Sequence, residues 1–270
     1  MRLAIFGNPV AQWKSPLIQT AFAAQFGLPD FEYGRILAPL DGFTEALQRF
    51  IAEGGQGGNV TAPFKEEAFR ACDRLTARAA AAQAVNTLKV EADGQLLGDN
   101  TDGAGLVADL NRFCSLAGKR ILVLGAGGAT RGAILPLAGE QPAEIVIANR
   151  TALKAVDLAA VFSAQVDVPV RGVALDQISG VFDVVIDATS ASLGGEAFPL
   201  PASVFGAGCV AYEMVYGKGE TPFMARAQEA GAAHRVDGLG MLVYQAVEAF
   251  ELWTGLRPEA EPVFALLRNA

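Results

Sequence analysis

The sequence predicts an α/β protein with two domains, of which the second carries a parallel sheet covered by helices on both faces. The chain has 270 residues, which fits two modest domains at about 150 residues each. Short β-branched and leucine runs alternate with stretches of helical spacing along most of the chain. One run, 120–124, leads directly into the segment G-A-G-G-A-T-R-G. A strand followed at once by such a segment indicates that a new sheet begins near residue 120.

The composition excludes several classes of protein. Hydrophobic residues make up 51% of the chain and charged residues 19%, so the chain can build folded cores and is not disordered. The net charge is -8 and no basic run is present, which argues against nucleic acid as a partner. No apolar run reaches the roughly 18 residues that a membrane span needs, and the first run, 3–6, is broken at once by Gly-Asn-Pro, unlike a signal peptide. We expect a cytoplasmic protein that has no membrane partner.

The cysteines and the histidine indicate no metal site. The chain has three cysteines, far apart and without a C-x-x-C pattern, and one histidine. Neither a disulfide framework nor a zinc site is therefore expected, and no metal is implied.

The first hundred residues predict two strand–helix units followed by a hairpin. Ser15-Pro16 indicates the start of a helix with serine as its N-cap, and Gly27 its end. Asp93-Gly94 between two apolar runs predicts a hairpin. The expected strands are 3–6, 32–38, 57–60 and two runs between 85 and 97, and the expected helices are 15–27, about 41–53, one that opens at 61–63 and contains Lys65, and 77–84.

The rest of the chain predicts the second sheet and a helical C-terminus. The apolar spacing is helical from Gly103 to about Leu116, and it is helical again after Asp237. Strands separated by helical stretches are typical of a parallel sheet with helices on both faces. The expected strands are 120–124, 144–148, 168–172, 181–186 and 208–212.

The segment G-A-G-G-A-T-R-G, residues 125–132, predicts a turn that binds a dinucleotide. Gly125 at the strand end permits the tight turn, and Gly127 lets the backbone approach a pyrophosphate at the N-terminus of the next helix. Thr130 replaces the third glycine of the usual pattern. A glycine turn without a ligand is the alternative, but the position between a strand and a helix argues for the dinucleotide.

The tip of the next strand indicates which dinucleotide binds. A site for NAD usually has an acidic residue there, which accepts a hydrogen bond from the ribose. Here the strand ends in Asn149, Arg150 and Thr151, with Lys154 one helical turn further on. A guanidinium can bind a 2′-phosphate in a bidentate manner and a lysine can add a second cation, which favours NADP. The alternative is that both cations are solvated surface charges.

Lys65 and Asp102 are the candidates for acid–base chemistry. A coenzyme that takes hydride from an alcohol needs a partner group for the hydroxyl proton. Lys65 follows a short buried strand, so it emerges at the carboxyl end of a sheet, where open α/β folds bind ligands. Asp102 opens the next helix. The spacing alone favours other roles, a solvated lysine and a helix N-cap.

Nine short segments, which span nearly the whole chain, resemble the shikimate dehydrogenases in order and spacing. They are G-N-P-V at Gly7, K-S-P at Lys14, N-V-T-A-P-F-K at Asn59, A-V-N-T at Ala84, G-D-N-T-D-G at Gly98, G-A-G-G-A-T-R-G at Gly125, N-R-T at Asn149, G-K-G-E-T-P-F at Gly217 and D-G-L-G-M-L at Asp237.

This resemblance implies a fold and a reaction. We expect an N-terminal α/β substrate domain at 1–101, completed by C-terminal helices at 237–270, a doubly wound Rossmann NADP domain at 102–236, and an active site in the cleft between them. The implied reaction is the reversible, NADP-dependent reduction of 3-dehydroshikimate to shikimate. The partner is this small molecule, and the protein is a monomer or a homodimer.

The resemblance also implies roles for individual residues. Lys65 and Asp102 form the catalytic pair, in which Lys65 exchanges the hydroxyl proton and Asp102 orients lysine and substrate; a carboxylate base with lysine as electrostatic stabiliser stays open. The substrate site comprises Ser15, Thr61, Asn86, Tyr216 and Gln245, with Trp13 beside them. The coenzyme site comprises Gly125, Ala126, Gly127, Gly128, Ala129, Thr130, Asn149, Arg150, Thr151, Lys154, Thr189, Met214, Gly238 and Met241.

Trp13 departs from the family's pattern. The family has the first serine of S-x-S-P at this position, where it binds the substrate carboxylate, and this chain retains only Ser15. Two alternatives follow, a paralogue that acts weakly or on quinate or a related ring hydroxy acid, and a coenzyme-binding module without catalysis. The retention of Lys65, Asp102 and Asn86 argues against the second, because NADP binding alone does not require them.

Overall fold

Two compact units make up the computed structural model, which describes residues 1–189, 199–217 and 219–268. Unit 1 comprises Met1–Gly105 and Val243–Ala270, and unit 2 comprises Leu106–Leu242. The chain leaves unit 1 within helix α5 (Asp102–Leu110) and returns to it within helix α9 (Leu239–Thr254). Each unit has one six-stranded sheet, so the predicted α/β class with two domains is confirmed.

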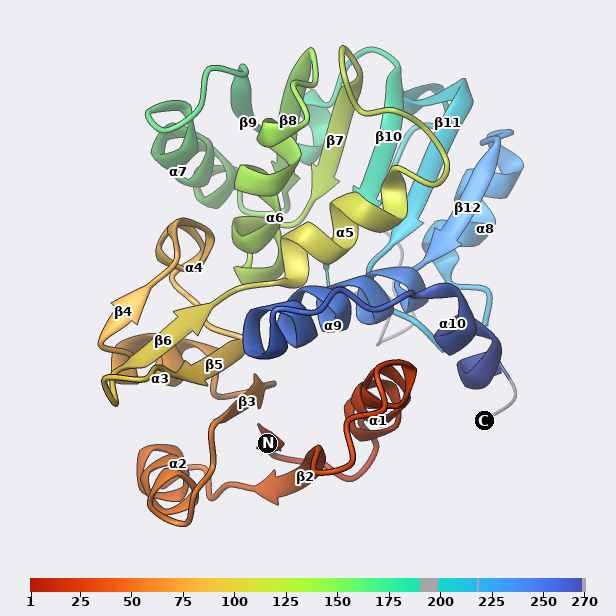
Figure 1. The fold of residues 1–270 in the computed structure, drawn as a ribbon. Helices are drawn as coiled ribbons and strands as arrows, with labels where there is room; N and C mark the ends of the chain where they lie inside the picture. The colour runs from red at the N-terminus through yellow and green to blue at the C-terminus, as the bar shows by residue number, and fades with distance from the viewer. Residues whose placement is uncertain (190–198, 218, 269–270) are drawn as a thin grey trace. The chain divides into compact units, whose positions relative to one another are not determined.

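The sheet of unit 1 is mixed, with the strand order β2-β1-β3-β5-β6-β4 (Figure 1). The first three strands are parallel, as two strand–helix units require. The predicted hairpin is present as the antiparallel pair β5–β6. The strands are β1 (Arg2–Gly7), β2 (Glu32–Leu37), β3 (Gly57–Val60), β4 (Arg74–Leu75), β5 (Thr87–Val90) and β6 (Leu96–Asp99).

Aromatic side chains fill the core of unit 1. Phe6 of β1 lies edge-on to Phe43, which stacks on Phe64 with 5.2 Å between the ring centroids. From the C-terminal part of the chain, Trp253 of α9 donates its indole N–H to the carbonyl of Leu88 at 2.8 Å. The C-terminal residues therefore complete the core that the N-terminal residues begin. The other helices of this unit are α1 (Ser15–Gln25), α2 (Phe43–Ala52), α3 (Lys65–Ala71), α4 (Ala77–Ala82) and α10 (Glu261–Arg268).

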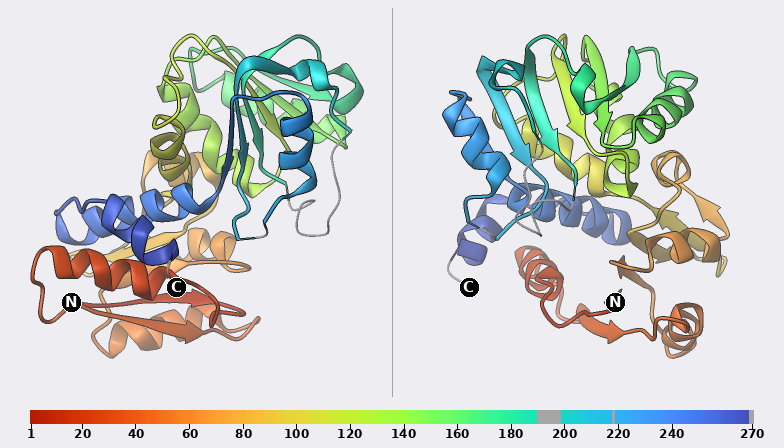
Figure 2. Two further views of the ribbon diagram at one scale, coloured as in Figure 1. Left: turned by 90° about the vertical axis from the view of Figure 1, so that its right-hand side faces the viewer. Right: turned by 180° about the vertical axis from the view of Figure 1, so that it is seen from behind.

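The sheet of unit 2 is fully parallel, with the strand order β12-β11-β10-β7-β8-β9 (Figure 1, Figure 2). The order reverses between β7 and β10, which makes the unit doubly wound, as predicted. In such sheets ligands bind at the carboxyl ends of the strands beside this reversal. The elements are β7 (Arg120–Leu124), α6 (Gly128–Gly139), β8 (Glu144–Asn149), α7 (Ala152–Ser163), β9 (Val170–Ala174), β10 (Phe182–Asp187), β11 (Phe205–Glu213), α8 (Pro222–Glu229) and β12 (His234–Asp237), with two short 3-10 helices at Leu175–Gln177 and Ala202–Val204.

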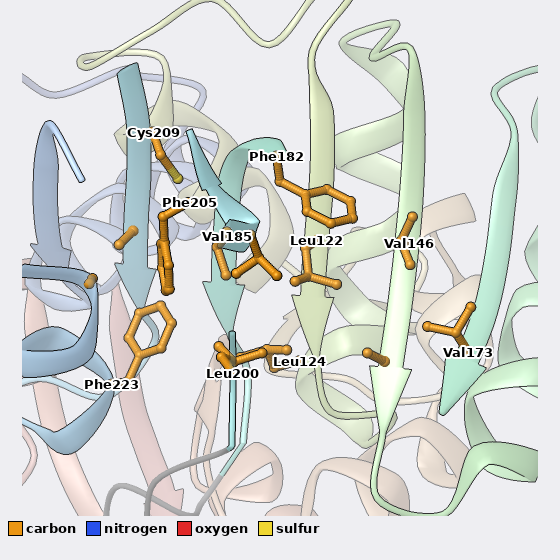
Figure 3. Packing of buried hydrophobic residues seen from close by; sticks show 14 residues of the cluster. Leu122, Leu124, Val146, Val173, Phe182, Val185, Leu200, Phe205, Cys209 and Phe223 are labelled. Carbon is orange, nitrogen blue, oxygen red and sulfur yellow. The ribbon is translucent and has the colours of Figure 1, made fainter. Parts of the chain in front are cut away.

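One face of this sheet packs against α8. Leu122 and Val146 project from neighbouring central strands, and Phe205 packs near Phe223 of α8 with 6.2 Å between the ring centroids (Figure 3). The central strands are buried on both faces, which explains why their sequences are continuous apolar runs rather than alternating ones.

Some predicted boundaries were wrong. Helix α3 begins at Lys65 rather than at 61–63, because residues 61–64 form a turn in which the Phe64 N–H donates to the Thr61 carbonyl. The N-cap of α1 is Lys14, and Ser15 is already helical. Helix α5 ends at Leu110 rather than near 116, and the sequence did not predict β4, α8 or β12.

None of the described helices is both long and apolar enough to cross a membrane. Within the same residues, no three His, Cys, Asp or Glu side chains gather in a way that could hold a metal ion.

Arg78 joins three elements of unit 1 through an ion network. Its Nε and Nη2 donate to the two carboxylate oxygens of Asp99 at 2.7 and 2.6 Å, and its Nη1 donates to Glu248 of α9 at 3.0 Å. The Asp99 side chain is only 1% exposed. Burial by itself raises the pKa of Asp99, but the hydrogen bonds and charge of Arg78 outweigh it and hold that pKa below its ordinary value.

We predict that Arg78→Met lowers the free energy of unfolding of unit 1 by about 3 kcal/mol at pH 7, because it leaves the Asp99 carboxylate buried without a cation. Urea denaturation followed by tryptophan fluorescence measures this quantity. The chain has two tryptophans, Trp13 and Trp253, and both belong to unit 1.

The control is Arg74→Met, which breaks an exposed ion pair with Asp93 in the same unit and is expected to cost at most about 1 kcal/mol. Because the pKa of Asp99 is lowered in the folded protein, the contribution of its ion pair is complete above the unfolded value of about 4 and is lost as the pH falls through the folded value. The difference between wild type and Arg78→Met should therefore shrink below about pH 4. Equal losses for the two variants at pH 7 would contradict the assignment.

Candidate active site

Lys65 and Asp102 form an ion pair, with Nζ of the lysine 2.6 Å from Oδ2 of the aspartate. Lys65 is the first residue of α3, and Asp102 is the first residue of α5. The lysine side chain is 34% exposed and the aspartate side chain 21% exposed. Both charged groups therefore contact each other and still reach solvent, which leaves room for a ligand.

Asn86 holds the other oxygen of the same carboxylate. Its Nδ2 donates to Oδ1 of Asp102 at 2.7 Å, and its Oδ1 accepts the backbone N–H of Thr101 at 2.9 Å. Asn86 itself is buried. Since both carboxylate oxygens of Asp102 accept hydrogen bonds, its orientation is fixed.

The residues before Asp102 are anchored in turn. Asn100 donates its amide to the carbonyl of Ala84 at 3.0 Å and accepts the backbone N–H of Asp102 at 3.2 Å. The carboxylate of Asp99, bound by Arg78, accepts the backbone N–H of Asn100 at 2.7 Å. The segment D-N-T-D is thus a set of buried polar groups whose bonds lead to the partly exposed carboxylate of Asp102.

Gln245 and Thr61 also belong to unit 1. Gln245, on α9, accepts a long hydrogen bond from Thr101 Oγ1 at 3.4 Å. Thr61 lies buried directly after β3, four residues before Lys65. Gly7 is required there, because a Cβ at Gly7 would lie 2.5 Å from the Thr61 methyl group.

Ser15 and Trp13 lie at the start of α1. Ser15 is buried, 4% exposed, and the residue before it, Lys14, is the N-cap and makes no side-chain capping bond with the residues that the structure describes. Trp13 is half-buried, and its indole N–H donates to the carbonyl of Pro9 at 3.3 Å. The one polar hydrogen of the Trp13 side chain is therefore used within its own loop.

The glycine segment of unit 2 has the geometry of a pyrophosphate site. Gly125 has a φ of +100°, a left-handed conformation that favours glycine, and its carbonyl accepts the Thr130 hydroxyl at 2.9 Å. Helix α6 begins at Gly128, and no side chain among the described residues caps its N-terminus. A Cβ at Gly127 or Gly128 would meet nothing within 4 Å. Uncapped N–H groups beside open space suit a pyrophosphate, and Ala126 and Ala129 complete this segment.

The tip of β8 carries cations that are not neutralised. Arg150 and Lys154 are exposed, and neither forms an ion pair with any of the residues that the structure describes. Asn149 donates its amide to the carbonyl of Thr151 at 3.0 Å, which closes the turn. Two free cations at this strand end fit the extra phosphate of NADP.

The remaining predicted coenzyme residues lie at the carboxyl ends of β10, β11 and β12. Thr189 donates its backbone N–H to Asp187 at 2.9 Å. Gly238 packs on β11's end, since a Cβ there would lie 2.1 Å from the carbonyl oxygen of Met214. Met241 is half-buried in the first turn of α9.

Tyr216 is half-buried in unit 2, where burial raises the pKa of its hydroxyl. Within unit 1, the structure thus brings Lys65, Asn86 and Asp102 together, and it does not connect Ser15 to them by any hydrogen bond between described residues.

Sequence reasoning missed several residues of these two sites. Arg131, in the first turn of α6, is a third cation beside the pyrophosphate segment, and the R of G-A-T-R-G could have indicated it. Arg78 and Asp99 were missed because their roles arise from contacts between residues far apart in the sequence. The same holds for Asp109 and Tyr212, which bond across 103 residues.

Three family models match: the shikimate dehydrogenase substrate binding domain at residues 5–88, shikimate / quinate 5-dehydrogenase at 108–194 and the shikimate 5'-dehydrogenase C-terminal domain at 238–268. The shikimate dehydrogenase (NADP(+)) of Dechloromonas aromatica is 55% identical over 98% of this chain and 96% of its own length.

Two solved structures are similar over the full fold. An enzyme named Ael1 from Pseudomonas putida has a TM-score of 0.93 and 46% identity, covering 98% of this chain and 97% of its own. The shikimate 5-dehydrogenase of Thermus thermophilus, solved with NADP(H) and shikimate, has a TM-score of 0.86 and 32% identity, covering 100% of this chain and 99% of its own.

Sequence motifs, fold and relatives agree over nearly the entire length of the chain. The chain belongs to the shikimate dehydrogenase family.

Proposed function

We propose that this protein catalyses the reversible, NADP-dependent reduction of 3-dehydroshikimate to shikimate. The observation that carries the proposal is the Lys65–Asp102 ion pair, with Asn86 on the second carboxylate oxygen. It occurs in a chain that is 55% identical to a shikimate dehydrogenase (NADP(+)). A chain that only bound NADP would have no need of this pair.

Lys65 serves as the proton donor and acceptor. The coenzyme, when bound, would supply a hydride to the carbonyl carbon as NADPH, or accept one from the alcohol carbon as NADP⁺. In the reducing direction the Lys65 ammonium gives a proton to the carbonyl oxygen as it becomes a hydroxyl, and in the oxidising direction the lysine amine takes the hydroxyl proton. Asp102 holds the lysine, and its two occupied oxygens favour this orienting role over that of a base.

The other residues hold the two ligands. Thr61, Asn86, Gln245 and Tyr216 bind substrate hydroxyls or lie beside them, and the buried hydroxyl of Ser15 binds the carboxylate. In unit 2, residues 125–130 bind the pyrophosphate, the cations Arg150 and Lys154 bind the 2′-phosphate, Arg131 lies beside the pyrophosphate, and Thr151 and Asn149 shape the turn at the tip of β8. A cytoplasmic monomer or homodimer stays a prediction.

The proposed reaction is tested by the absorbance of NADPH when the protein is mixed with NADP and a panel of ring hydroxy acids. We expect faster turnover of shikimate than of quinate. Turnover of quinate or another ring acid in preference to shikimate would support the paralogue instead. No turnover of any of them would support a protein that binds the coenzyme without catalysing a reaction.

We predict that Lys65→Ala lowers kcat for shikimate by about 100-fold or more and changes KM far less, because proton transfer in the transition state contributes about 10² to 10⁴. Steady-state kinetics measure both. Lys89→Ala is the matched control, since Lys89 is 31% exposed and also pairs with a carboxylate of unit 1, Glu91. The role of Lys65 is wrong if the two variants turn over shikimate equally fast.

We predict that Arg150→Ala raises KM for NADP by about 10- to 150-fold, which corresponds to about 1.5 to 3 kcal/mol for a hydrogen bond to a charged group. KM for NAD should hardly change, because NAD has no 2′-phosphate. The control Arg171→Ala removes an exposed cation of unit 2 that already pairs with Glu144, and it should affect neither coenzyme. Equal losses for NADP and NAD in Arg150→Ala would show that this arginine serves the fold or the adenine.

We predict that Trp13→Ser improves kcat/KM for shikimate by about 10-fold or more, chiefly through KM, because it adds a second hydroxyl that can donate to the carboxylate. The indole N–H, occupied by Pro9, supplies no such donor. Ser15→Ala should have the opposite effect and raise KM for shikimate. An unchanged or poorer kcat/KM in Trp13→Ser would show that Trp13 itself favours shikimate binding through packing.

A further inference from the structure

A buried carboxylate in unit 2, that of Asp109, contacts the first turn of α9. Asp109 lies on α5 and is fully buried. Its Oδ2 accepts the Tyr212 hydroxyl at 2.8 Å, and its Oδ1 accepts Nη1 of Arg112 at 2.7 Å. This charge is therefore paired and hydrogen-bonded, as a buried carboxylate must be.

Tyr212 passes the contact on to α9. Burial, and next the negative charge of Asp109, raise the pKa of Tyr212 well above its ordinary value. The hydroxyl therefore stays protonated and donates a hydrogen bond to the carboxylate. The same hydroxyl oxygen accepts the backbone N–H of Met241 at 3.2 Å. One tyrosine thus connects a buried anion to the N-terminal turn of α9.

Gly240 shows how closely the carboxylate approaches that turn. A Cβ at Gly240 would lie 1.9 to 2.1 Å from the carboxyl atoms of Asp109, so glycine is the residue that fits. On the other side, the Gly238 N–H donates to the carbonyl of Val215 at 3.3 Å. Residues 238–241 are therefore held at one end by the carbonyl of Val215 and at the other by the Asp109–Tyr212 pair.

We propose that Asp109 and Tyr212 are positioning residues for the nicotinamide, because they fix the turn that carries Gly238 and Met241, two residues that the family resemblance places in the coenzyme site. This inference rests on the proposed function, and it takes those two residues to contact the nicotinamide ring. Neither Asp109 nor Tyr212 touches the coenzyme itself. They affect the distance and the angle at which the hydride is transferred. A displacement of the nicotinamide by 1 Å lowers the rate of hydride transfer on the order of 10²-fold and changes coenzyme binding far less.

The test variant is Tyr212→Phe, which removes one oxygen atom and retains the ring that fills the core. In the protein without coenzyme, the Met241 amide should exchange its hydrogen at least about 10-fold faster, since its acceptor is gone. With coenzyme, kcat should fall about 10-fold, and the primary isotope effect with NADPH deuterated at C4 should rise as hydride transfer becomes rate-limiting. KM for NADPH should change by less than about threefold, because the phosphate contacts are intact.

The matched control is Tyr33→Phe, which removes the hydroxyl of a half-buried tyrosine in unit 1, where it donates to Asn59 at 2.6 Å. It should leave Met241 exchange and the isotope effect at their wild-type values. A loss of stability alone would lower the folded fraction in either variant without raising the isotope effect. Gly240→Ala forces the carboxylate away by a different route and should raise the isotope effect as Tyr212→Phe does.

Two outcomes overturn the inference. One is a folded Tyr212→Phe whose kcat and isotope effect stay at the wild-type values. The other is an equal rise of the isotope effect in Tyr33→Phe. If wild type itself does not turn over shikimate, the proposed function fails instead, and Met241 exchange still reports whether Tyr212 fixes the turn.

Discussion

The ion pair between Lys65 and Asp102 is the interaction on which the proposed site depends, because it joins the first turns of two helices that follow different strands of unit 1. Neither residue could hold this geometry alone, since a lysine has a flexible stem and a helix-terminal carboxylate can rotate. Asn86 fixes the carboxylate from one side, and the bonds from Arg78 through Asp99 and Asn100 fix the backbone that carries it. Buried polar groups thus place the partly exposed pair to which we assign the proton transfer.

Unit 2 uses its charges in the same way. The buried carboxylate of Asp109 is satisfied within the protein and holds backbone, whereas Arg150 and Lys154 stay exposed at a strand tip, and neither forms an ion pair with the residues that the structure describes. The N-terminus of α6 likewise has no side-chain cap among the residues that the structure describes. In the proposed site, groups that are bonded within the fold hold the backbone in place, and the exposed cations and the N-terminus of α6 bind the phosphates of the coenzyme.

Local patterns predicted what local forces determine. The strands 57–60 and 120–124 were predicted with their observed bounds. Residues 120–124 are a short β-branched and leucine run beside a glycine-rich segment, which favours a buried strand. Strand β12 was missed because its residues lie half or fully exposed at a sheet edge and show no alternation. The pairing of Lys65 with Asp102 was predicted only from the family resemblance. Two further pairs leave no local pattern in the sequence, because tertiary packing brings their members together. These pairs are Arg78 with Asp99 and Asp109 with Tyr212.

The central claim is that Lys65 exchanges the substrate's hydroxyl proton while Asp102 holds it in place. Chemical rescue tests this most directly: the Lys65→Ala variant is assayed with NADP and shikimate in the presence of small primary amines of graded basicity. The account predicts that added amines restore turnover in a saturable manner, with rates that follow amine basicity, because an amine in the vacated space can take the same proton. A variant that binds both ligands as wild type does, and whose residual turnover is the same at every amine concentration, would contradict it.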